Sequence, residues 1–226
     1  MGAGLDVTGR SAPDGRVPAA ERQRAIALRS EDADHPATER ILDATARRVA
    51  SGGAAALALS EIARDAGVSK ALIHYHFVDK ETLLARLIDH LARDIAARER
   101  KALDPFEHGH NPLAVDALWG WLQGELERGS INVLLELDAY RGPAVQAAAR
   151  EAAAVRQSAA QETIERLFEI LELRPRIEPA LLAAVHVAFV DGLAIRSGLA
   201  RKAEIEPTSP RVAFDVFWLA MLSLAE

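Results

Sequence analysis

The chain has 226 residues, none of them cysteine, and only 5% are aromatic. The absence of cysteine excludes disulfide scaffolds and thiolate metal sites, and it fits a reducing cytoplasm. No apolar run reaches the roughly 18 residues that cross a bilayer, because His186 and Asp191 interrupt the best candidate, residues 181–195. The N-terminus also lacks the apolar segment of a signal peptide. These absences predict a cytoplasmic protein without a membrane partner.

Catalytic motifs are missing as well. The sequence has no Gly-rich phosphate loop and no nucleophile elbow, and its carboxylates are scattered without a pairing pattern. We therefore expect neither an enzyme nor a bound cofactor.

The 33 acidic residues outnumber the 27 Lys and Arg, and the resulting net charge of −6 argues against a generally basic nucleic-acid binder. The charge is unevenly spread. Residues 36–80 hold six Lys/Arg against five Asp/Glu, so this segment is +1 and the remainder is −7. A focused contact surface on an acidic body suits site-specific binding and predicts weak affinity for random DNA.

Helix-forming residues dominate what is present. Half of the residues are hydrophobic, Ala and Leu are abundant, and runs of β-branched residues are scarce. The length is sufficient to bury a full core in one or two domains. The composition predicts a largely helical protein.

Residues 59–84 read as two short helices joined by a tight turn, followed by the start of a longer helix. Gly67 can adopt the positive φ that ends a helix and reverses the chain. Ser69 is a good N-cap for the second helix, because its hydroxyl accepts from the free amides two or three residues on. Ile73 and Phe77, four residues apart, return to the core side. This pattern predicts a helix-turn-helix.

The second helix of this motif has an outward face that can enter a DNA major groove. Lys70, His74 and Tyr75 can contact phosphates or base edges there. Lys80, at the start of the next helix, combines a cation with exposed amides and suits a backbone phosphate. The predicted DNA-binding residues are Ser69, Lys70, Ala71, His74, Tyr75 and Lys80. Use of the motif for protein packing alone is the alternative.

This stretch resembles the DNA-binding signature of the TetR (tetracycline-repressor-like) family of bacterial transcriptional regulators. The resemblance is carried by Ile62-Ala63, Ala66-Gly67-Val68-Ser69, Tyr75-His76-Phe77, Lys80 and Leu83-Leu84. Two positions depart from the usual pattern. Ala58 stands where the family often has a Thr or Ser that caps a helix and touches a phosphate, and His74 stands where Tyr is usual.

The resemblance implies an all-α fold with an N-terminal three-helix DNA-binding domain and a C-terminal helical domain that binds a small molecule and dimerises. We expect a flexible N-terminal arm over residues 1–35, the helix-turn-helix domain over 36–82, and the effector-binding and dimerisation domain over 83–226. The arginines of the arm could reach a minor groove. The alternative for the arm is a solvated tail.

The boundaries of several elements can be predicted from local signals. Pro36 suits the first turn of the first helix, and Asp79 suits the N-cap of the fourth. The prolines, glycine and asparagine of residues 103–112 predict a loop. The last two helices, about 178–200 and 209–225, are apolar on most sides. Helices this apolar bury two faces, which predicts a homodimer through a four-helix bundle of these two helices and their copies.

Large and amphipathic side chains of the C-terminal region predict an effector pocket between its helices. The candidates are Trp119, Trp121, Tyr140, Phe168, His186 and Phe189. Polar groups near them, His186 together with Asp138 or Gln123, could orient a ligand. Ordinary core packing is the alternative for each of these residues.

Two groups of histidines could suggest a metal site. His74 and His76 are two residues apart and face different directions on a helix, so one ion cannot use both. Glu107, His108 and His110 fall in a predicted loop, without an evident fourth ligand nearby. We therefore expect no metal site.

These observations together predict a sequence-specific transcriptional regulator, a repressor that a small-molecule effector of unknown identity releases from a near-palindromic double-stranded operator. The alternative is a helix-turn-helix regulator or DNA-organising protein without a small-molecule ligand.

Overall fold

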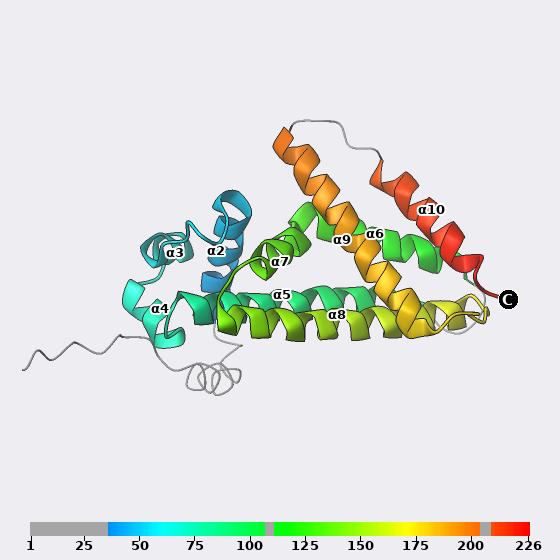
Figure 1. Ribbon diagram of the computed structural model, residues 1–226, viewed down its shortest axis with the longest axis horizontal. Coiled ribbons are helices and arrows are strands. Elements are labelled where there is room, and N and C mark those ends of the chain that lie inside the picture. Colours follow the sequence, from blue (N-terminus) through cyan, green and yellow to red (C-terminus); the bar gives the residue numbers. More distant parts are fainter. Residues whose placement is uncertain (1–35, 107–110, 204–208) are drawn as a thin grey trace, which may run out of the picture.

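The computed structural model describes residues 36–106, 111–203 and 209–226, apart from the side chains of 201–203. The predicted arm over residues 1–35 and the loop residues Glu107, His108 and His110 lie outside this part of the chain. Within the described ranges the protein is all-α (Figure 1). The helices are α2 (Pro36–Gly52), α3 (Leu59–Ala66), α4 (Lys70–His76), α5 (Lys80–Ala102), α6 (Leu113–Arg128), α7 (Ser130–Asp138), α8 (Pro143–Ile170), α9 (Pro179–Ala203) and α10 (Pro210–Leu222).

Helices α2, α3 and α4 form a three-helix unit at one end of the molecule (Figure 1), which we call the reader. Its interior is apolar: Ile41, Ile62 and Ile73 are fully buried, and Phe77 is 2% exposed. The i, i+4 spacing of Ile73 and Phe77 therefore brings both to the core, as predicted. Each deeply buried side chain of this kind contributes about 1.5–3 kcal/mol through removal from water.

The turns of the reader have the predicted chemistry. Gly67 ends α3 in the left-handed region with φ +65°, where a Cβ would be strained. The Ser69 hydroxyl accepts the amide of Leu72 at 3.1 Å and so caps α4. Asp79 caps α5 in the same way, with its Oδ1 2.8 Å from the amide nitrogen of Thr82. Ala58 precedes α3 in an extended conformation and supplies no side-chain cap.

The larger part of the molecule is built on two long helices. Helices α5 and α8 lie side by side along most of their length, and α7, α6 and α9 pack over them, with α10 at the far end from the reader (Figure 1). The buried apolar residues of this part and of the reader belong to one continuous cluster that runs from Ile41 to Met221.

Helix α5 links the two parts without a break. It begins directly after the reader at Lys80 and continues to Ala102. Leu83 and Leu84, at its start, are fully buried. The domain boundary that we propose at residues 82/83 thus falls inside a continuous helix.

Helix α9 is more apolar than expected. By length and composition its segment Pro179–Ala200 could cross a membrane, contrary to the expectation that no segment would reach that length. Of an 18-residue stretch within it, 33% is buried. The two groups expected to interrupt it are used in tertiary contacts instead. His186 contacts Glu99 of α5 at 3.1 Å, and Asp191 accepts from Arg156 of α8 at 2.6 Å. One such helix is weak evidence for a membrane, and these contacts place α9 within the helical packing of the protein.

The missing cap of α3 gives a stability prediction. Replacing Ala58 with Ser should raise the free energy of unfolding by about 1 kcal/mol, because an extended N-cap residue can then accept a free amide of the first turn. Chemical denaturation measures this difference. Ala97→Ser, at an exposed interior position of α5, is the matched control and should lower stability by about 0.5 kcal/mol. Equal effects of the two substitutions would contradict the capping argument.

Candidate nucleic-acid interface and ligand site

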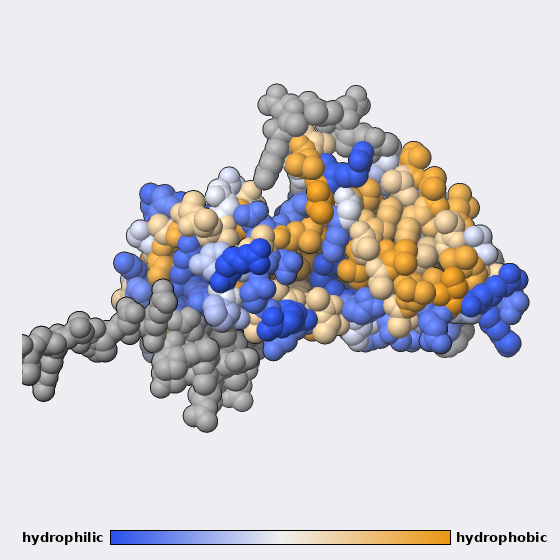
Figure 2. All heavy atoms as spheres, viewed as in Figure 1, coloured by the Kyte–Doolittle hydropathy of each residue, from blue (hydrophilic) through white to orange (hydrophobic). Residues whose placement is uncertain are grey.

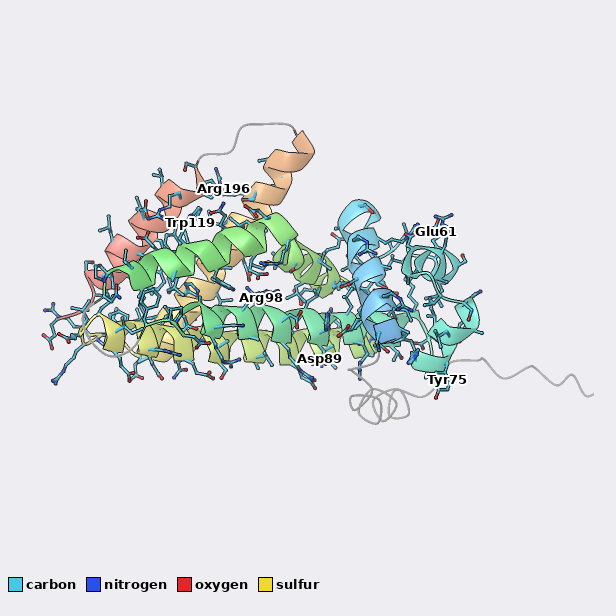
Figure 3. All side chains as sticks on the ribbon, turned by 180° about the vertical axis from the view of Figure 1, so that it is seen from behind. Glu61, Tyr75, Asp89, Arg98, Trp119 and Arg196 are labelled. Carbon is cyan, nitrogen blue, oxygen red and sulfur yellow. The ribbon has the colours of Figure 1, made fainter. Side chains whose placement is uncertain are left out.

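Five of the predicted DNA-binding residues form one exposed surface on α4 and its cap. We call Ser69, Lys70, Ala71, His74 and Tyr75 the reading surface, and all five are solvent-exposed. Tyr75 is 69% exposed and projects from the reader away from the rest of the molecule (Figure 3). A row of donors on a short capped helix has the form that fits a major groove.

The opposite side of α4 is structural. His76 is buried, with its Nδ1 3.4 Å from the Thr38 hydroxyl of α2, and Phe77 lies in the core. His74 is exposed on the other side. The two histidines therefore occupy different environments, as the i, i+2 spacing on a helix predicts.

Lys80 differs from the other five predicted residues. Its ammonium donates to the carbonyl oxygen of Ala55 at 3.1 Å, and partial burial lowers the pKa of Lys80. The side chain therefore ties the start of α5 to the loop between α2 and α3. A phosphate contact by Lys80 requires this hydrogen bond to be shared or exchanged.

A second cation of the reader is also internally paired. The guanidinium of Arg48 donates to Glu61 at 2.5 Å and to Asp65 at 2.6 Å, which holds α2 against α3. The hydrogen bond from Arg48 lowers the pKa of Asp65. The positive charge available on α4 itself is thus that of Lys70.

Four of the six predicted pocket residues meet in one group of rings. They are joined through three rings of α10, and we call the seven together the aromatic cluster: Trp119, Trp121, His186, Phe189, Phe214, Phe217 and Trp218. The closest stack is that of Phe189 on Phe217, with ring centroids 4.0 Å apart. Trp119 lies on the side of α6 that faces α10 (Figure 3). The rings of α10 follow an i, i+3, i+4 spacing in the sequence, a signal of one buried face that could have placed them here.

His186 is the polar centre of this cluster. It is 2% exposed, and its Nε2 lies 3.1 Å from Oε1 of Glu99, which is 4% exposed. The imidazole contacts the rings of Trp121 and Trp218, with centroids 6.1 and 5.7 Å away. Within the described residues, the buried His186 Nδ1 and the two indole nitrogens make no hydrogen bond. The cluster therefore offers polar atoms that a ligand group can satisfy.

The other two predicted pocket residues lie apart from these rings. Tyr140 is at the turn between α7 and α8, where its carbonyl accepts from Gln146 at 2.9 Å. Phe168 is buried in α8, and among the ring contacts of the described chain it makes none with the aromatic cluster. Helical periodicity predicts that a side chain faces inward, but it does not tell which helix covers it.

A carboxylate near the reader connects it to the rest of the molecule. Glu81, in the first turn of α5, accepts the backbone amide of Ala144 at 2.7 Å. Ala144 belongs to the first turn of α8, whose N-cap Gly142 has no side chain to do this. The negative charge also suits the positive end of the α8 dipole. Sequence reasoning missed this contact because the partners are 63 residues apart.

Among the residues that the structure describes, no group of three or more His, Asp or Glu side chains is arranged to hold a metal ion. The groups considered from the sequence at Glu107, His108 and His110 lie outside those residues.

The region of helices α2, α3 and α4 and the start of α5 is similar in sequence to known proteins. Residues 41–87 match the model of the tetR family of bacterial regulatory proteins. The HTH-type transcriptional regulator BetI from Agrobacterium fabrum is 42% identical over 55 residues, which are 24% of this chain and 27% of that protein. The alignment thus spans about a quarter of the curated relative.

Solved structures are similar over most of the chain. NemR of E. coli in its reduced form has a TM-score of 0.65 at 17% identity, covering 85% of this chain and 99% of that one. The SmeT–triclosan complex has a TM-score of 0.62 at 16% identity, with coverage of 82% and 91%. At these identities the likeness establishes a shared fold.

The contact between Glu81 and α8 can be tested by its removal. Glu81→Ala should lower the free energy of unfolding by about 1 kcal/mol, because the helix end loses an acceptor. Glu81→Gln should retain part of the effect, since an amide oxygen can still accept. Urea denaturation measures both, with Glu151→Ala at an exposed position of α8 as the control. A control that is as destabilised as Glu81→Ala would show that the capping contact has no particular weight.

Proposed function

We propose that this chain, whose helix-turn-helix belongs to the tetR family of bacterial regulatory proteins, is a cytoplasmic, sequence-specific transcriptional repressor that a small-molecule effector releases from its operator. The observation that carries this proposal is the reading surface, which presents Lys70, His74 and Tyr75 to solvent on a capped helix. A buried core fixes the opposite side of that helix. The tetR family is one of regulators and not of enzymes, which supports a non-catalytic role.

In this proposal α4 enters the major groove of double-stranded DNA. Lys70 and Tyr75 bind phosphates or base edges, His74 acts as donor or acceptor, and Ala71 allows close approach to the bases. Ser69 presents the start of the helix to the phosphate backbone, and Lys80 adds a contact when it exchanges its bond to Ala55. A dimer places two such helices in successive major grooves, about 34–36 Å apart on a near-palindromic site.

The homodimer forms through α9 and α10. Large hydrophobic side chains are exposed on both helices, and Figure 2 shows hydrophobic residues gathered over α10 and the neighbouring part of α9. They are Leu181, Val185, Ile195 and Leu199 on α9, and Val212, Val216 and Leu219 on α10. Apolar surface of this extent marks an interaction site. Two copies of this helix pair about a two-fold axis make a four-helix bundle, which also accounts for the apolar character of α9 without a membrane.

The effector binds between the helices that meet at the aromatic cluster. Its rings come from α6, α9 and α10, and the buried Glu99 of α5 contacts His186 at their centre. The SmeT–triclosan complex, which has the same fold, holds a small molecule. A ligand that prefers one arrangement of these helices shifts α5 and thereby the reader. A coupling of about 1–3 kcal/mol between effector and DNA suffices.

The direct test is a mobility-shift titration of the purified protein on DNA fragments from around its own coding region, with competitor DNA and rising salt. The expected result is a discrete complex with the stoichiometry of one dimer that resists competitor DNA. Selection from a random-sequence library then covers operators located elsewhere. A protein that enriches no sequence, with or without a small-molecule library present, is not a sequence-specific regulator.

On the selected operator, Lys70→Ala and Tyr75→Ala should each weaken binding at least about tenfold, because each removes a polar contact of about 1.5 kcal/mol. Both side chains are exposed, so the fold and the dimer should persist. Arg150→Ala, an exposed cation on α8, is the control for loss of charge alone. Wild-type affinity in either reading-surface variant would refute the assignment of that contact.

Leu219 is 70% exposed on α10, and Leu219→Glu should convert the dimer to a monomer by placing a charge in an apolar interface. Sedimentation velocity gives the mass, and operator affinity should fall with it because a monomer contacts one half-site. Ala153→Glu on the exposed side of α8 should leave a dimer. A Leu219→Glu protein that remains dimeric would move the interface elsewhere.

A further inference from the structure

A shallow groove of about 260 Å³ lies between α5 and α6. It is lined by Arg98, Lys101, Ala102, Ala117, Gly120, Trp121, Gly124 and Arg128. Every charged residue in this lining is a cation, although the chain as a whole carries a net charge of −6. Arg98 lies on the side of α5 that faces α6 (Figure 3). The groove is therefore a local concentration of positive charge on an acidic protein.

A buried carboxylate holds two of these cations in place. Glu125 of α6 is fully buried, and its Oε1 lies 2.6 Å from Nε of Arg98 and 3.2 Å from Nη1 of Arg128. Arg98 also donates from Nη2 to Oε2 of Glu125 at 3.2 Å and from Nη1 to Asp94 at 3.3 Å. With Lys101 the groove has three cations against these two carboxylates, so one positive charge remains. An arginine has five N–H donors. Arg98 uses three of them in these contacts and Arg128 uses one, so most of the donors left for an anion belong to Arg128 and Lys101.

The apolar part of the lining suits a flat group. A Cβ added at Gly120 would have no atom within 4 Å, whereas the Arg128 side chain lies against Gly124. Trp121 also lines the groove and is 9% exposed. Its indole nitrogen is buried and has no hydrogen-bond partner among the described residues. The same indole stacks on His186 of the aromatic cluster at 6.1 Å. The lining of the groove thus combines cationic side chains with an indole that contacts the aromatic cluster.

We propose that this groove binds a small aromatic carboxylate, with its anionic group between Arg98, Lys101 and Arg128 and its ring against Trp121. Guanidinium groups recognise carboxylates by charge-assisted hydrogen bonds, and an aromatic ring gains from stacking on an indole. This inference rests on the proposed function, because it takes the bound molecule to be the effector. It assigns that effector to the chemical class of aromatic carboxylates.

The position of the groove connects the anion to the reader. Arg98 and Lys101 belong to α5, which begins at the reader, whereas Arg128 belongs to α6. An anion held by both helices favours the separation of α5 and α6 that fits it. Because it interacts differently with the two arrangements of α5, it can shift their populations.

The experiment uses the full-length protein and two flat probes of equal shape, 2-naphthoate and its neutral counterpart 2-naphthamide. Quenching of tryptophan fluorescence reports binding near any of the three tryptophans, and the variants described next assign it to the groove. The naphthoate should bind about tenfold more tightly than the amide, as expected for one charge-assisted hydrogen bond. Equal affinities, or no saturable binding of naphthoate, would overturn the proposal.

Two variants locate the binding. Gly120→Leu fills the open space of the groove and should abolish binding of naphthoate, while the better helix propensity of leucine maintains the fold. Lys101→Glu reverses an exposed charge and should weaken naphthoate at least about tenfold but change the amide little. Ala154→Leu, which adds the same side chain at an exposed position of α8, should bind like the wild type. Wild-type affinity in Gly120→Leu would place the ligand outside this groove.

Operator binding, measured separately by mobility shift, distinguishes the two proposals. A protein that binds naphthoate in the groove but selects no DNA sequence has the ligand site without the regulatory role. A protein that selects an operator but does not discriminate naphthoate from the amide is a regulator whose effector belongs to another chemical class.

Discussion

The packing of α5 against both the reader and α8 is the constraint on which the rest of the structure depends. Its first turn is buried beneath the reader through Leu83 and Leu84, and its later turns lie along α8. Glu81 adds a polar bond from the same turn to the start of α8. Because one apolar cluster runs through both parts, the reader cannot rotate independently of α5. The orientation of α4 relative to the rest of the chain is therefore set by contacts formed well away from it.

Polar groups in the apolar interior determine which helices lie against α5. The contact between Glu99 and His186 joins α5 to α9, and the contact between Arg98 and Glu125 joins α5 to α6. Arg128, which belongs to α6 itself, contacts the same Glu125 carboxylate. Removing one partner of such a contact would leave a buried polar or charged group unsatisfied. These contacts therefore favour one arrangement of α5, α6 and α9. They also place ionisable side chains where a bound molecule can compete for them.

Much of the reader was predictable, and less of the ligand site was. Gly67, Ser69 and Asp79 act through local backbone chemistry, so their roles as helix ends and caps could be read from neighbouring residues and are confirmed. The inward faces of the later helices were predictable from periodicity in the same way. Which side chains meet across the interior could not be predicted, because those contacts depend on how helices distant in the sequence pack together. Tyr140 and Phe168 consequently lie apart from the aromatic cluster, whereas Phe214 and Trp218 join it. Lys80 was expected to be free for a phosphate and is bonded to Ala55, a contact that depends on the path of a loop.

The length of α5 has a geometric consequence. A continuous helix of 23 residues is about 34 Å long, comparable to the spacing of successive major grooves. A tilt of about 5° about its far end would carry its reader end through about 3 Å, since the displacement grows with the length of the rod. In a two-fold dimer both ends would move, and the mismatch with a rigid DNA repeat would double. In the proposed regulator the helix would act as a lever, because a side-chain-sized movement at the effector end would be enlarged at the end that carries α4.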